Sequence, residues 1–217
     1  MRNLLNKELF LSSSKISYLF ILFGAMAMIP GYPILVGPFF VCFGIFQTFQ
    51  SGRENNDILY TVLLPVRKTD AVRAKFAFAV IIQMAAFLLE TILTILRMLV
   101  FSEAVPYVNN AMMNANQIYL AWSLVIFAIF NYLFIGGYFK TAYKFAGPFV
   151  TFLITAFVVI IAAEVLHHIP GLAFLNSTSP IDNGFMWGTL AAGALIYGIV
   201  TLVACKVSVK RFEKVDL

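Results

Sequence analysis

The sequence has little charge and almost no cysteine. Only 12% of its 217 residues are Asp, Glu, Lys or Arg, whereas 61% are hydrophobic. Soluble domains carry about 25% charged residues, and no soluble core of this size could bury so much apolar side chain. The two cysteines, Cys42 and Cys205, form no CxxC pair or metal-binding spacing, so we expect them to serve in packing. The composition therefore predicts an integral membrane protein.

Motifs of nucleotide-binding proteins and enzymes are also missing. No Gly-x-x-x-x-Gly-Lys-Ser/Thr phosphate loop is present, so another polypeptide would have to handle ATP. No basic stripe interleaved with aromatic residues points to nucleic acid. Glu164 and His168, one helical turn apart and next to His167, could form a metal site or a proton relay, but no HExxH pattern supports them. We expect these groups to meet water at the membrane interface, and we expect no metal site.

Long apolar runs dominate the sequence. Six of them approach the roughly 20 residues needed to cross a hydrocarbon core about 30 Å thick. The connections and tails between them are too short for a separate soluble domain. Residues 1–217 are therefore expected to form a single all-α polytopic domain. We place its six transmembrane helices at 16–31, 33–50, 76–101, 117–139, 147–166 and 184–205.

The basic residues give an orientation. With six spans, all but one of the 15 Lys and Arg residues fall on one side, in the N-terminal tail, the second and fourth connections and the C-terminal tail. Lys and Arg are disfavoured in loops that cross the membrane, so this side is cytoplasmic. We expect a multi-pass protein of the plasma membrane with both termini in the cytoplasm.

The connection between the second and third spans, DILYTVLLPVRKTDAVRAK, is more structured than a turn. Residues 54–57 can cap a helix and place negative charge at its start. Pro65 ends this helix, and Thr69 can cap a second one with Asp70 in its first turn, continuous to about Phe101. The first helix is amphipathic, with an apolar face made of Ile58, Leu59, Val62 and Leu63.

Two interpretations of this connection are open. It could be an interfacial helix whose basic residues contact anionic lipid. Alternatively, it could be a stiff helix–proline–helix elbow that presents Leu64, Pro65 and Val66 to a cytoplasmic partner. A short rigid elbow between two spans can transmit a push, which a loose lipid-facing loop cannot.

The same segment resembles the connection between the second and third spans of ABC-2-type transporter permeases. In that family an acidic or polar lead precedes a Leu-Pro-Val core, a basic-polar pair, a helix cap and a basic-aromatic entry into the third span. The N-terminal LLNKELFLSSSK is similar to the family's amphipathic connecting segment. In size and layout the chain is also similar to membrane subunits that export phenol-soluble modulin peptides. The matching residues are Asp57, Leu64-Pro65-Val66, Arg67-Lys68, Thr69-Asp70, Arg73 and Lys75-Phe76.

This resemblance implies the membrane subunit of an ATP-driven exporter for an apolar or amphipathic substrate, such as a peptide or a lipid-like molecule. The elbow would be a coupling helix seated on a separate cytoplasmic ATPase, which would bind ATP and magnesium. A second permease chain, the same or related, would complete the unit. The chain itself would bind no cofactor and catalyse no reaction. The residues expected to contact the ATPase are Asp57, Leu59, Leu63, Leu64, Pro65, Val66, Arg67, Lys68, Thr69 and Asp70.

Charged residues inside the membrane form a second candidate site. Glu90 and Arg97 lie seven residues apart on one face of the third span. Such groups usually face the bundle interior and have partners. They could line a transport route or latch two subunits together, or they could form a structural salt bridge with Arg97 reaching outward. Gln83 and Asn131 are expected to face the interior as well.

Other functions are compatible with the composition. A substrate-capturing subunit of a vitamin-type importer has a similar size, but its Ala-x-x-x-Ala pattern is missing from the first span. A membrane-embedded enzyme would need acidic and histidine residues clustered at one depth, and a structural or accessory role is also open. Residues 169–183 are too apolar for a solvated loop, and the resemblance implies short re-entrant helices there.

Overall fold

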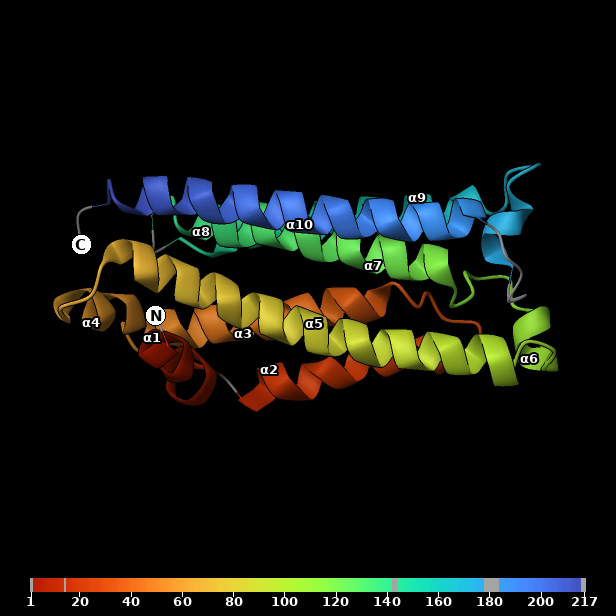
Figure 1. Cartoon of the computed structure of the whole chain (residues 1–217), viewed down its shortest axis with the longest axis horizontal. Coiled ribbons are helices and arrows are strands. Elements are labelled where there is room, and N and C mark those ends of the chain that lie inside the picture. The colour runs from red at the N-terminus through yellow and green to blue at the C-terminus, as the bar shows by residue number, and fades with distance from the viewer. Residues whose placement is uncertain (1, 14, 142–143, 178–183, 216–217) are drawn as a thin grey trace.

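The computed structural model describes residues 2–13, 15–141, 144–177 and 184–215, and within them the chain is helical and has no β-strand. The long helices run along one common axis, as Figure 1 shows. In chain order the elements are α1 (Arg2–Lys7), η1 (Glu8–Ser12), α2 (Lys15–Leu19), η2 (Phe20–Met28), α3 (Val36–Glu54), α4 (Asp57–Leu63), α5 (Lys68–Val100), α6 (Val105–Val108), α7 (Gln117–Ile129), η3 (Phe130–Ile135), α8 (Gly136–Tyr138), α9 (Ala146–Leu166), η4 (Ala173–Asn176) and α10 (Gly184–Phe212).

Within the described residues, four helices are long and apolar enough to cross a membrane: α5, the continuous run α7–η3–α8, α9 and α10. A fifth candidate exists if Arg2–Ser12 and Lys15–Met28 are taken together as one bent span. Helix α3 occupies the predicted second span but is not among these candidates, because its last third is polar. The all-α membrane fold is confirmed, and the count of six spans stays a prediction.

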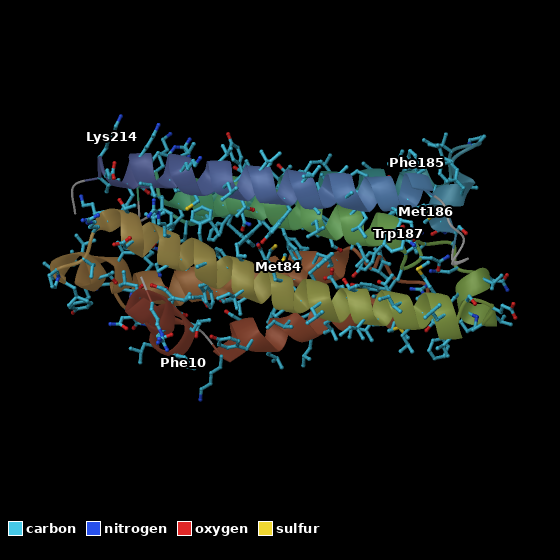
Figure 2. All side chains as sticks on the ribbon, viewed as in Figure 1. Phe10, Met84, Phe185, Met186, Trp187 and Lys214 are labelled. Carbon is cyan, nitrogen blue, oxygen red and sulfur yellow. The ribbon has the colours of Figure 1, made fainter. Side chains whose placement is uncertain are left out.

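The two ends of the bundle differ. Helices α1 and α4 and the start of α5 lie at one end, together with the last turns of α10, whereas α6 lies at the opposite end (Figure 1). We call these the elbow end and the distal end. In Figure 2 the side chain of Phe10 points away from the bundle at the elbow end, and Trp187 lies at the distal end of α10. Phe10 is 80% exposed, as expected of an apolar side chain that faces lipid.

Aromatic rings fill the space between α3, η3 and α9. Phe46 stacks on Phe149 with 3.9 Å between ring centroids, and Phe39 stacks on Phe152 at 5.9 Å. Phe134 of η3 meets Phe46 edge-on at 5.5 Å. Stacked and edge-on pairs of this kind are worth about 0.5–1.5 kcal/mol beyond the area they bury. The many phenylalanines of the second predicted span thus act in packing between helices.

Helices α2 and η2 approach α3 closely because α3 carries glycine at the contact. The Ser17 hydroxyl donates a hydrogen bond to the Gly44 carbonyl at 2.5 Å, and it lies 2.6 Å from the hydroxyl of Thr48. A Cβ added at Gly44 would lie 2.6 Å from the Cβ of Phe20. The missing side chain therefore sets the distance between the two helices.

We expect the change Gly44→Ala to destabilise the protein by about 1–3 kcal/mol, the usual penalty for overpacking. The matched control is Gly198→Ala on α10, where an added Cβ would meet nothing within 4 Å. There the gain in helix propensity should leave stability unchanged or raise it by up to about 1 kcal/mol. Thermal unfolding in detergent micelles compares the two variants. Equal melting temperatures would contradict the close packing at Gly44.

Candidate functional site

The elbow, residues 57–70, has the predicted helix–proline–helix form. Helix α4 ends at Leu63, Leu64 and Arg67 are extended, and α5 begins at Lys68. Since Pro65 has no amide hydrogen and disfavours the helical conformation for the residue before it, the break falls where the sequence predicted. The elbow projects from the bundle between α3 and α5 (Figure 1).

The predicted caps are wrong in detail. The residue before α4 is Asn56, which adopts the left-handed conformation (φ 51°) and makes no capping side-chain bond. Helix α5 starts one residue before Thr69, with Arg67 as its uncapped N-terminal neighbour. Thr69 instead donates a hydrogen bond from its hydroxyl to the Glu213 carboxylate at 3.2 Å. The Thr69 side chain therefore makes a tertiary contact with Glu213, just after the end of α10, and not the helix cap that the local pattern predicted.

The apolar residues of α4 face two directions, which corrects the prediction of a single face. Ile58 is buried against the bundle, whereas Leu59 and Leu63 point outward. Together with two neighbours they form an exposed apolar patch at the tip of the elbow, the elbow patch, whose exposed fractions are Leu59 43%, Tyr60 65%, Leu63 74% and Leu64 53%. Of the other predicted contact residues, Pro65 and Arg67 are exposed, and the partly buried ones are Asp57, Val66, Lys68, Thr69 and Asp70.

Behind the elbow lies a closed ring of four ion pairs, the ion-pair ring, made by Lys7, Glu8, Asp57 and Lys75. The Lys75 ammonium lies 2.8 Å from a carboxylate oxygen of Glu8 and 2.8 Å from one of Asp57. Lys7 lies 2.5 Å from Asp57 and 3.1 Å from Glu8. Glu8 and Lys75 are 2% and 4% exposed. The ring therefore joins the N-terminal segment to both arms of the elbow, with its charges balanced.

Hydroxyl groups complete this junction. Lys7 also donates to the Thr61 hydroxyl at 2.6 Å, and Thr61 donates in turn to the backbone carbonyl of Asp57 at 2.7 Å. The Ser12 hydroxyl donates to the Asp57 carboxylate at 3.0 Å. Because buried ion pairs need such extra hydrogen bonds to offset desolvation, the junction is built to hold one geometry.

The ring makes stability depend on acid pH. Burial alone would raise the pKa of the Asp57 carboxyl, but the charges of Lys75 and Lys7 and their hydrogen bonds outweigh it and lower that pKa from 3.8 to about 2. The group thus stabilises the fold above pH 3.8, and this contribution is lost as the pH falls through about 2. We expect the melting temperature of the wild type to fall across this window. The change Asp57→Asn should remove that part of the pH dependence, and a parallel fall in both proteins would contradict it.

The other side of the elbow is tied to the last residue of α10 and to the residues that follow it. The Lys68 ammonium donates to the backbone carbonyl of Val215 at 2.8 Å and lies 5.9 Å from the ring centroid of Phe212. With the bond from Thr69 to Glu213, this gives three contacts within two residues of α5. The elbow is thus held on one side by the N-terminal segment and on the other by α10.

Arg97 and Glu90, the predicted intramembrane charges, are both fully buried but do not bind each other. The Arg97 guanidinium donates to the backbone carbonyl of Ala27 and to the side-chain oxygen of Asn114, both at 2.5 Å. It also lies 4.2 Å from the ring centroid of Tyr107. Arg97 therefore joins η2, α5, α6 and the segment before α7 at the distal end, and the alternative of a Glu90–Arg97 salt bridge is wrong.

The Glu90 carboxylate has no hydrogen-bond partner within the described part of the chain. The Ser123 hydroxyl is near enough to interact electrostatically, without a hydrogen bond of normal geometry. Gln83, seven residues before Glu90 on α5, and Asn131 of η3 are by contrast hydrogen-bonded to each other. Their amides exchange bonds of 2.9 and 3.0 Å, and Tyr197 donates to Gln83 at 2.9 Å. Inside the bundle, the side chains of Gln83, Asn131 and Tyr197 are thus hydrogen-bonded to one another, whereas the Glu90 carboxylate has no hydrogen-bond partner among the described residues.

The remaining candidates act in packing of the distal end. The Glu164 carboxylate accepts a bond from the backbone amide of Met113 at 2.8 Å, and a ring nitrogen of His167 lies 3.2 Å from the Ala111 carbonyl. No group of three His, Cys, Asp or Glu side chains that could hold a metal occurs among the residues with described positions. Of the predicted re-entrant segment, η4 is helical, and residues 178–183 lie outside the described residues.

A family model described as an ABC-2 family transporter protein matches residues 3–209. The chain belongs to the ABC-2 transporter family. This ABC-2 protein is the membrane permease component of an ABC transporter, as the resemblance of the elbow predicted. Neither the curated proteins nor the solved structures contain a match to it. The narrower likeness to phenol-soluble modulin exporters stays a prediction.

Sequence reasoning missed the ion-pair ring of this ABC-2 permease. A local signal was present in the spacing, because Glu8 follows Leu4 by one helical turn and so shares a face with an apolar residue. The structure buries both side chains. Its partner Lys75 is 67 residues away, and no local pattern links the two. The prediction assigned Lys75 to the basic charge that keeps the elbow cytoplasmic and to the entry into the third span.

Proposed function

We propose that this chain is the membrane subunit of an exporter whose elbow docks on a separate cytoplasmic ATPase, and that it moves an apolar or amphipathic substrate outward. Two copies, or this chain and a related one, would form the transport route. Both termini and the elbow would lie in the cytoplasm, where the ATPase binds ATP and magnesium.

The observation that carries this proposal is the elbow patch. Its apolar side chains lie on a short helix at the tip of the molecule, on a rigid base of buried ion pairs. Exposed apolar patches rimmed by polar groups mark interaction sites, and a short amphipathic helix fits a groove of a partner. A helix whose role was to lie on lipid would have no need of the buried attachments on both sides.

Those attachments suggest how the ATPase acts. A push on the elbow would reach the N-terminal segment through the ion-pair ring and α10 through Lys68 and Thr69. Helix α5 is 33 residues long and runs from the elbow past Arg97 to the distal end. ATP-driven closure of the ATPases would therefore bias two arrangements of the same helices.

The test changes Leu59, Leu63 and Leu64 of the elbow patch together to alanine and measures how much ATPase co-purifies from native membranes. Removing three central apolar contacts should weaken capture about tenfold or more, since such positions dominate interface energies. The matched control changes Val105 and Val108, which are 70% and 60% exposed at the distal end, to alanine. This control should capture as much ATPase as the wild type.

Failure of the wild type to capture an ATPase, with or without nucleotide, would refute the exporter proposal. Equal capture by the elbow variant and the distal control would leave an ATPase partner but remove the elbow patch as its binding site. In that case the polar residues of α5 would be the next place to look.

A further inference from the structure

A recess of about 530 Å³ lies at the elbow end, where the chain passes from α8 to α9. Figure 1 shows α8 at this end of the bundle. Lys140 and Lys144 line the recess, which we call the basic recess, and no acidic residue of the described chain lines it. Both lysines are exposed, and neither ammonium makes a hydrogen bond or an ion pair with a residue of described position. The basic recess therefore presents two positive charges that are free to bind an anion.

A third cation lies on the other flank of Lys144. A smaller hollow of about 280 Å³ is lined by Lys144 and by Arg53 of α3, whose guanidinium lies 4.9 Å from the ring centroid of Phe145. Ala146 and Gly147, in the first turn of α9, also line it, and Phe145 gives this turn no side-chain cap. The partial positive charge of a helix N-terminus thus adds to the charge of the three basic side chains.

An apolar groove of about 350 Å³ continues from the basic recess toward the middle of the bundle. Leu133 lines both hollows, and Thr151 of the recess and Thr155 of the groove are one turn apart on α9. The two threonine hydroxyls already donate to backbone carbonyls of α9, at 3.1 and 2.9 Å. No charged residue of the described chain lines the groove, and its other walls come from α7, η3 and α10, with Val125, Ile129, Tyr132, Ile196 and Val200 among them.

The groove is about as long as the part of a lipid chain that lies in one leaflet. Val125 precedes Leu133 by eight residues, which is about 12 Å along a helix. One leaflet contributes about half of a hydrocarbon core about 30 Å thick. Lys140 follows Leu133 by seven residues and lies nearer the elbow end. Basic walls and apolar walls therefore follow each other in the order in which a phospholipid presents its phosphate and its acyl chain.

Charge and shape together select one class of occupant. A free phosphate ion would bind the lysines but would leave the apolar groove unfilled. A zwitterionic lipid would bring its own cation next to three basic side chains, which repel it. A phospholipid with a net negative charge satisfies both parts, and basic pockets between membrane helices are known to bind such head groups.

We propose that this hollow binds an anionic phospholipid, with its phosphate at Lys140 and Lys144 and one acyl chain in the apolar groove between α7, α9 and α10. The inference goes beyond the proposed function, since neither the elbow patch nor an ATPase takes part in it. With the elbow end in the cytoplasm, as proposed, the lipid comes from the inner leaflet. Because its chain contacts all three helices, the bound lipid stabilises their packing at the elbow end.

The test measures lipid binding to the purified permease in a non-ionic detergent by native mass spectrometry. Phosphatidylglycerol and phosphatidylcholine with identical acyl chains are titrated separately, so that a difference in affinity comes from the head group. We expect the first phosphatidylglycerol to bind about tenfold to thirtyfold more tightly, the effect of two basic residues near a membrane surface. Saturation should also raise the melting temperature, because the lipid binds the folded chain.

Two double variants test the head-group position. Changing Lys140 and Lys144 together to alanine should lower the affinity for phosphatidylglycerol to that for phosphatidylcholine. The matched control, Lys206→Ala with Lys210→Ala, removes the same charge from exposed positions of α10 that line neither hollow. This control should bind phosphatidylglycerol as the wild type does.

Two further variants test the chain position. Ile196→Trp places a larger side chain in the apolar groove and should weaken the binding of both lipids. Its control is Ile199→Trp, at a position that is 61% exposed on α10 and does not line the groove, and it should change neither affinity. In detergent without added lipid the site is empty, so all four variants should melt as the wild type does, which shows that each retains the fold.

Equal affinities of the wild type for the two lipids would overturn the proposal. Equal behaviour of the two double-lysine variants would do the same, because the lipid would then respond only to the overall charge of that end. Displacement of phosphatidylglycerol by glycerol phosphate at equal concentration would show that the head group alone is bound, and equal effects of the two tryptophan variants would remove the chain from the groove. No ATPase is needed, so a failed ATPase capture leaves these results unaffected.

Discussion

Replacing Lys75 with methionine should lower the free energy of unfolding by about 3–5 kcal/mol, the range for removing one partner of a buried ion pair. Methionine keeps the length of the side chain but leaves the carboxylates of Glu8 and Asp57 without the charge that holds them together. Both carboxylates would then have to take up protons or separate, which detaches the N-terminal segment from the elbow. Unfolding in mixed detergent micelles measures the difference.

Two further variants show whether the loss of stability comes from the ion-pair ring. Lys210→Met removes an exposed lysine near the end of α10 and should change stability by less than about 0.5 kcal/mol. Adding Glu8→Gln to Lys75→Met removes one of the unpaired charges and should restore part of the lost stability. Additive losses in the double variant would mean that Glu8 and Lys75 do not interact, contrary to the ion-pair ring.

Replacing Arg97 with methionine should lower stability by about 2–4 kcal/mol and loosen the distal end. The change removes two charge-assisted hydrogen bonds, each worth about 1.5–3 kcal/mol, and the contact with the ring of Tyr107, while it also relieves the desolvation of the guanidinium. Hydrogen–deuterium exchange should rise around Ala27 and Tyr107, and the elbow end should be unaffected.

A lysine at this position should give an intermediate result, since its ammonium cannot reproduce the forked geometry of the guanidinium. The exposed Lys140 supplies the control, and Lys140→Met should exchange hydrogen at the wild-type rate throughout. If Arg97→Met left exchange near Ala27 unchanged, the distal end would be held together by other contacts, and the hydrogen bonds of Arg97 to Ala27 and Asn114 would not stabilise it.

Much of this fold follows from local patterns. Low charge and long apolar runs predicted an all-α membrane protein, and Pro65 placed the break in the elbow correctly. These features depend on residues close together in the chain. The six-span count was harder because α3 mixes a phenylalanine-rich start with a polar end, so length and composition alone do not class it as a span.

What could not be predicted depends on contacts between distant residues. Thr69 has the right spacing for a cap, but Glu213 binds it, 144 positions away. Glu90 and Arg97 share a helix face, yet Arg97 binds Ala27 and Asn114, because η2 and the segment before α7 come closer than a side chain two turns away.

The long separation of the ring partners has a consequence for how the protein is made. Ribosomes deliver the N-terminal segment first, but Glu8 finds Lys75 only after 67 further residues have emerged. Until the loop with α4 and the first turns of α5 has been synthesised, Glu8 and Lys7 have to stay in water or at the lipid head groups. Docking of the N-terminal segment thus requires that α3, α4 and the first turns of α5 have been made, and a chain stalled earlier in synthesis would leave Lys7 and Glu8 without Asp57 and Lys75 as partners.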